Sequence, residues 1–121
     1  MKYIMKLLIS ILLITITLAG HSQSNDILEL VKITSSGLIN KQEVSFNSET
    51  SSLIVGNWVI PVSSNTHVKI LKGNQVEFSL QKGTAVTSLD DSLLRKAWFT
   101  LSFNSRKSAK EFINAFNKIS N

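Results

Sequence analysis

Residues 97–119 read AWFTLSFNSRKSAKEFINAFNKI, and the hydrophobic period changes within this stretch. Up to Phe103 every second residue is apolar, which is the pattern of a half-buried β-strand. From Ser105 onward the apolar residues follow the spacing of one helical face. The stretch therefore predicts a strand followed directly by an amphipathic helix at about 106–119, which buries its apolar face against a sheet.

The start of this helix has two candidate caps. Ser108 and Glu111 have the spacing of a capping box, whereas Ser105 would begin the helix earlier. Lys118 falls in the last turn, where a cation complements the helix dipole. The residues expected to face the core are Ala97, Phe99, Leu101 and Phe103 in the strand and Ala109, Phe112, Ile113, Phe116 and Ile119 in the helix.

The sequence before this stretch indicates more antiparallel strands. Gly-Asn pairs at 56–57 and 73–74 each separate two apolar runs, which is typical of a tight hairpin. Pro61 is expected where a strand ends or runs along an edge. A further turn is expected at 82–83, and the inward residues of the strand before it are Val76, Phe78 and Leu80.

Residues 27–33, ILELVKI, fit a helix or a strand, and a helix is favoured because Asp26 can cap it. Residues 34–42, TSSGLINKQ, have the composition of a loop.

The first 22 residues have the organisation of a secretory signal peptide. Lys2 and Lys6 precede an apolar run of 13 residues, Leu7–Ala19, and small residues follow it. A helix of this length spans about 20 Å, less than the roughly 30 Å of a bilayer core. Cleavage is expected within residues 20–24, which leaves one domain at 23–121 that is exported to the periplasm or secreted. An uncleaved N-terminal anchor is the alternative. The chain has no cysteine for lipid attachment or disulfides.

Charge is uneven along the expected mature domain. Without Lys2 and Lys6, 11 basic residues face 8 acidic ones, a net of +3. From Lys69 onward nine basic residues face four acidic ones, a local net of +5. Such asymmetry can mark an anionic partner, but scattered surface lysines usually serve solubility, and this is the favoured interpretation.

Two stretches resemble bacterial members of the pleckstrin-homology-like family. These are IPVSSNTHVKIL at 60–71 and the strand and helix at 97–119, and the resemblance extends over roughly residues 44–119. It implies an α+β fold, an antiparallel β-sandwich or partly open barrel of about six or seven strands closed by one C-terminal amphipathic helix. It also implies a scaffold for binding rather than catalysis. The phosphoinositide site of the family is not expected, because the corresponding stretch at 41–55 holds one Lys and two Glu.

The sequence contains few residues that are suited to catalysis. His67 is the one histidine beyond His21 at the leader's exit, and a lone strand histidine is more often structural or exposed. Asp90 and Asp91 fit turn chemistry better than a cation site. We therefore expect a non-enzyme with no cofactor and no metal site; a small hydrolase with an unfamiliar site is a remote alternative.

Binding is the expected function, and its candidate residues are Arg95, Lys96 and Trp98. Trp98 alternates with Phe99, so it is either an exposed anchor beside two cations or a cover over an open end of the sheet. Trp58 shares its face with Ile60 and Val62 and is expected in the core. The expected partner is an unknown protein and not a nucleic acid. The alternative is an anionic surface, such as lipid headgroups or cell-wall polymer, bound through the basic C-terminal half.

Overall fold

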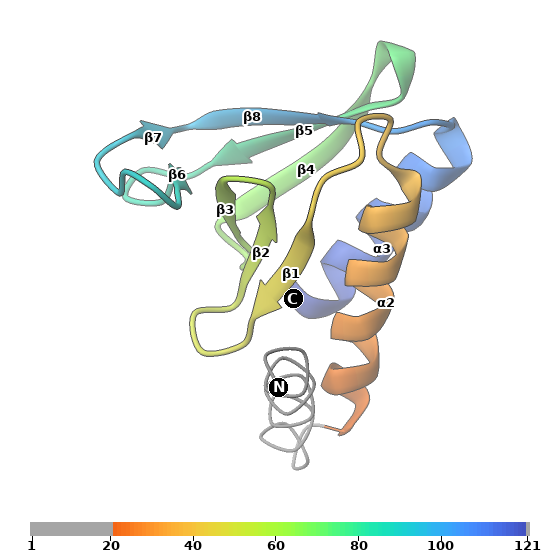
Figure 1. Ribbon diagram of the computed structural model, residues 1–121, viewed down its shortest axis with the longest axis horizontal. Coiled ribbons are helices and arrows are strands. Elements are labelled where there is room, and N and C mark those ends of the chain that lie inside the picture. The colour runs from red at the N-terminus through yellow and green to blue at the C-terminus, as the bar shows by residue number, and fades with distance from the viewer. Residues whose placement is uncertain (1–20, 121) are drawn as a thin grey trace, which may run out of the picture.

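The computed structural model describes residues 21–120, so the predicted signal peptide lies outside it except for its last two residues. Over this range the fold is α+β, with two helices and eight strands in two antiparallel sheets (Figure 1). The helices are α2 (His21–Gly37) and α3 (Arg106–Ser120), and a short 3-10 turn, η2, covers Lys72–Asn74. The strands are β1 (Val44–Asn47), β2 (Ser52–Val55), β3 (Trp58–Pro61), β4 (Thr66–Leu71), β5 (Gln75–Leu80), β6 (Val86–Ser88), β7 (Arg95–Lys96) and β8 (Trp98–Ser102).

The two sheets have the strand orders β1-β2-β3-β6-β7 and β4-β5-β8. Their registers show that strands of the two sheets continue one another along the chain, with an interruption between the two halves. Trp58 lies opposite Ser88 in the β3–β6 pair, and the same register continues into β4–β5. Residues 58–71 and 75–88 therefore form one long hairpin that opens in the middle. β7 and β8, which are separated by a bend at Ala97, follow as the end strands of the two sheets.

Both predicted Gly-Asn hairpins are confirmed. Val55 pairs with Trp58 across a two-residue loop, in which Gly56 has φ +59°. In the second hairpin Gly73 and Asn74 have φ of +74° and +61°. These left-handed values are the conformations that glycine and asparagine adopt most readily, so the turn residues fix where the strands reverse.

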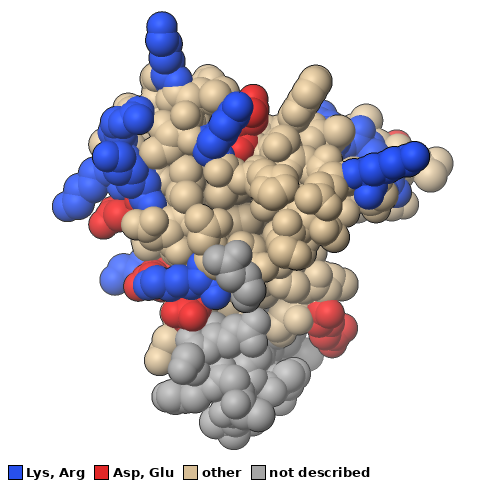
Figure 2. Space-filling model, turned by 180° about the vertical axis from the view of Figure 1, so that it is seen from behind, with Lys and Arg blue, Asp and Glu red and all other residues tan. Residues whose placement is uncertain are grey.

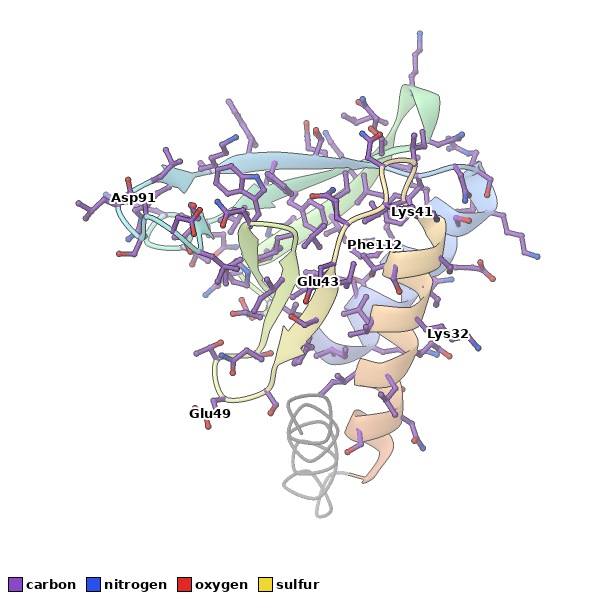
Figure 3. All side chains as sticks on the ribbon, viewed as in Figure 1. Lys32, Lys41, Glu43, Glu49, Asp91 and Phe112 are labelled. Carbon is purple, nitrogen blue, oxygen red and sulfur yellow. The ribbon has the colours of Figure 1, made fainter. Side chains whose placement is uncertain are left out.

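The core is an aromatic cluster between the sheets and the C-terminal helix. Phe78 on β5 packs against Phe112 and Phe116 of α3, with ring centroids 5.7 and 5.8 Å apart. Phe103 lies 5.0 Å from Phe112, which Figure 3 labels inside the fold. The prediction that α3 buries its aromatic face against the sheet is thus confirmed, and Ala115 joins that face.

The N-terminal helix is longer than predicted. A helix was favoured over 27–33, but α2 continues to Gly37, so the interpretation of residues 34–37 as loop was wrong. The hydroxyl of Thr34 donates to the Leu30 carbonyl at 2.6 Å, and Ser35 and Ser36 make the same bond one turn back. These bonds satisfy the hydroxyls inside the helix.

The end of α2 packs closely on the rest of the fold. A Cβ at Gly37 would stand 3.0 Å from the Phe103 ring, so the absence of a side chain permits this approach. Thr34 and Leu30 are fully buried, and α2 covers the sheets beside α3. The helix favoured over 27–33 is therefore present, and it contributes to the core together with α3.

An ion pair joins the two helices at the surface. Lys118 Nζ donates to a Glu29 carboxylate oxygen at 3.0 Å. This hydrogen bond and the charge of Glu29 raise the pKa of Lys118 above its ordinary value. The contact sets the position of α2 against the last turn of α3, where Lys118 also complements the dipole as predicted.

Ser105, the earlier of the two candidate caps, begins α3. The Ser108 N–H donates to Ser105 Oγ at 3.0 Å, which is the bond of an N-cap residue to the third helical residue. Ser108 lies inside the first turn and donates its own hydroxyl to Asn104. The capping box of Ser108 with Glu111 is therefore not formed.

Candidate functional site

Four large apolar side chains are exposed together around the loop between β6 and β7. Leu93 is 87% exposed and Trp98 71%, and Leu89 and Leu94 are about half exposed. In Figure 1 this loop lies at the end of the molecule away from both helices, and Asp91 marks it in Figure 3. We call residues 89–98 the tip.

The loop of the tip is built by short side-chain to backbone bonds. Asp91 accepts the Leu93 N–H on its carboxylate at 3.0 Å, and its carbonyl accepts the Leu94 N–H at 3.0 Å. The Asp90 N–H donates to Ser88 Oγ. The predicted turn chemistry is confirmed for Asp91, whereas Asp90 joins the turn through its backbone N–H, and this turn holds Leu93 outward.

The three predicted binding residues lie at the start of the last sheet strand but do not form one cluster. Trp98 is exposed, as expected if it is an anchor for binding. Arg95 is also exposed. Lys96 instead places Nζ 4.3 Å from the centroid of the Trp58 ring and 5.9 Å from that of Phe99, which are cation–π distances.

Two sequence predictions at this end of the sheet were wrong. Ala97 was expected to face the core, but the chain bends there and Ala97 is exposed. Trp58 was expected in the core with Ile60 and Val62. It is only half-buried, because it lies at the edge of the core between Phe99, 5.7 Å away, and the Lys96 ammonium.

A small pocket opens beside β8. Its volume is about 190 Å³, and Trp58, Phe99 and Leu101 supply much of its apolar wall. The remaining lining residues are Leu38, Asn40, Gln42, Thr100 and Ser102. No sequence pattern predicts this pocket, because Leu38, Asn40 and Gln42 lie in a predicted loop that only folding brings to β8.

The outer edge of β8 leaves backbone groups free. Phe103 N–H donates to Asn74 O and Leu80 N–H to Ala97 O, both at 3.0 Å, so the odd-numbered residues bond to β5. Antiparallel pairing alternates, and the N–H and C=O groups of Trp98 and Thr100 therefore point away from β5. Within residues 21–120 no strand pairs with this edge; Ile39 N–H closes its far end by donating to Ser102 O at 3.0 Å.

The other candidates offer little chemistry. His67 is exposed on β4 and contacts only the Gln81 amide among the side chains that the structure describes, at 3.2 Å. Across residues 21–120 no three His, Cys, Asp or Glu side chains come close enough to hold a metal ion. No helix in the described part is long and apolar enough to cross a membrane.

The basic residues of the second half are dispersed. Figure 2 shows Lys and Arg side chains at several separate places on one face rather than in one stripe. Two of these cations have acidic partners, Lys69 with Glu77 at 3.5 Å and Lys118 with Glu29. Arg95 and Lys96 lie within the tip, near its exposed apolar side chains.

Comparison with known proteins does not extend these observations. The chain matches no protein-family model, no curated protein and no solved structure.

Proposed function

We propose that this chain is an exported, non-enzymatic binding module whose contact surface is the tip. The observation that carries the proposal is the joint exposure of Leu93, Leu94 and Trp98 at one end of the fold. Exposed apolar side chains gathered in one place typically mark an interaction site. Apolar side chains that are exposed to water do not stabilise the fold of the tip, so a partner that covers them explains their presence.

The chemistry of the tip favours a protein partner with an apolar patch beside acidic groups. Tryptophan and arginine are the residue types that most often dominate binding energy, and Trp98 and Arg95 lie three positions apart in the chain. The non-enzymatic part of the proposal rests on the sequence, in which His67 is the one histidine beyond the leader's exit.

We also propose that the two sheets form the partly open barrel of a pleckstrin-homology-like domain. The meander of strands and the closing helix α3 support this classification. The proposed family is a scaffold for varied binding tasks, so it agrees with a binding role without naming the ligand.

Replacing Trp98 with alanine and Leu93 with serine together should abolish most partner binding while the domain stays folded. Both side chains are exposed, so the free energy of unfolding should change by less than about 1 kcal/mol, whereas loss of two interface anchors should weaken binding at least about tenfold. The measurement is retention of exported proteins on the immobilised chain, followed by titration of the purified partner. Leu28→Ser, at an exposed leucine on α2, is the matched control and should bind normally.

The anionic-surface alternative makes the opposite prediction. Binding to lipid headgroups or cell-wall polymer through the basic second half should fall steeply between low and high salt. It should also be insensitive to the two tip substitutions. Salt-sensitive binding that survives loss of Trp98 and Leu93 would contradict the tip proposal.

A further inference from the structure

We infer that the outer edge of β8 takes up an extended segment of a partner polypeptide, which adds a strand to the sheet and places one side chain in the pocket beside Trp58. This inference rests on the proposed binding function and specifies the kind of partner and how it is held. Three independent features of the edge point to it: free backbone groups, the pocket, and a pair of cations.

The backbone supplies the affinity. Trp98 and Thr100 present N–H and C=O groups on the side opposite β5, in the geometry of a strand whose neighbour is missing. Strand addition uses such an edge. The open edge of β8 runs from Trp98 to Thr100, three residues or about 10 Å; it begins after the bend at Ala97 and stops where Ile39 bonds to Ser102.

The pocket supplies selectivity. The side chains of Phe99 and Leu101 alternate with Trp98 and Thr100, so a strand laid along the edge would direct every second side chain toward the same inner layer. The pocket of about 190 Å³ lies there, between β8 and Trp58. That volume suits one side chain of moderate size, and the lining offers it both apolar and hydrogen-bonding groups. The intervening side chains of the segment would lie on the outer face beside the exposed Trp98 ring.

The charges at the open end select an acidic segment. Arg95 and Lys96 are exposed at the end of the edge that Ile39 does not close. Exposed acidic groups do occur nearby at Asp90 and Asp91, but they lie in the loop before the edge. An acidic side chain of the partner that reaches the edge would meet two cations, which favours its approach.

A second copy of this chain fits the edge less well. Its own β8 would bring a further Arg95 and Lys96 to the same edge. Its Phe99 and Leu101 already pack in their own core and could not enter the pocket. A separate polypeptide with an acidic residue and a free side chain for the pocket satisfies all three features.

The test compares the Thr100→Pro and Thr100→Ala variants, each in the form of the protein that is isolated from cells. Proline removes the outward N–H, which makes no bond to β5, and edge strands tolerate proline. Alanine keeps that N–H and removes the same side chain. The probe is a phage-displayed library of random octapeptides, selected on the unmodified protein. We expect the selected peptides to carry an acidic residue. The Thr100→Pro variant should bind them at least about tenfold more weakly than the unmodified protein, and the Thr100→Ala variant within about twofold of it.

A second measurement keeps the inference falsifiable if Thr100→Pro does not fold. One selected peptide is synthesised with single N-methyl groups at successive backbone positions. Methylation at alternate positions should abolish binding to the unmodified protein, and methylation between them should not. A uniform response along the peptide, equal binding by the two Thr100 variants, or selection of no peptide above background would each overturn the inference.

Two further outcomes separate this inference from others. If sedimentation shows a dimer that Thr100→Pro dissociates while Thr100→Ala does not, the edge binds a second copy and the inference is wrong. If the natural partner is lost with Trp98→Ala and Leu93→Ser but not with Thr100→Pro, the proposed tip function stands and only the strand addition fails. If the tip substitutions leave that partner bound, the proposed function itself fails.

Discussion

Replacing Phe112 with alanine is expected to lower the free energy of unfolding by about 3–5 kcal/mol, the usual cost of removing a fully buried aromatic side chain. Phe112 is fully buried on α3 and contacts the rings of Phe78, Phe103 and Phe116. The substitution removes the ring that joins the helix to two strands, and the surrounding rings can fill the cavity only in part. Chemical denaturation followed by circular dichroism measures the loss.

Trp98→Ala is the matched control, because it removes a larger aromatic side chain from a site that is 71% exposed. Its expected cost is below about 1 kcal/mol. If the two substitutions destabilised the protein equally, Trp98 would belong to the core, and the interpretation of the tip as a binding surface would be wrong.

Replacing Leu30 with alanine is expected to cost about 2–5 kcal/mol, within the range for buried leucines. Leu30 is fully buried on α2, beside Thr34. The loss follows if α2 is a structural part of the domain that packs against α3. The same denaturation experiment applies.

Leu28, two positions earlier on the same helix, is 51% exposed and provides the control. Leu28→Ala should change the free energy of unfolding by less than about 0.5 kcal/mol. Equal, small effects at both positions would mean that α2 is not docked on the core, and the close approach of Gly37 to Phe103 would then not form in solution.

The strands and α3 could be predicted because local sequence determines them. The Gly-Asn turns set two hairpins, and the alternation of Val76 and Phe78 with polar neighbours identifies the buried face of β5. The change of period after Phe103 placed α3 within a residue or two of its bounds. Each of these signals acts over a few residues and needs no distant contact.

The end of α2 and the candidate site depend on distant contacts and could not be predicted in the same way. Ser35 and Ser36 read as loop residues, but their hydroxyls bond inside α2, whose end is held by packing on Phe103. The pocket unites residues 38–42 with Trp58 and β8. Lys96 lies over Trp58 and not beside Trp98 because the chain bends at Ala97, and the alternation of residues alone does not reveal this bend.

The open edge of β8 is tested most directly by amide hydrogen exchange, read residue by residue along the strand. The N–H groups of Phe99 and Leu101 face β5 and can exchange only when the sheet opens. They should therefore exchange at least about a hundredfold more slowly than the N–H groups of Trp98 and Thr100. This alternation would establish the free edge on which strand addition depends. Uniform protection across residues 98–101 would mean that the edge is already covered, and it would contradict the account.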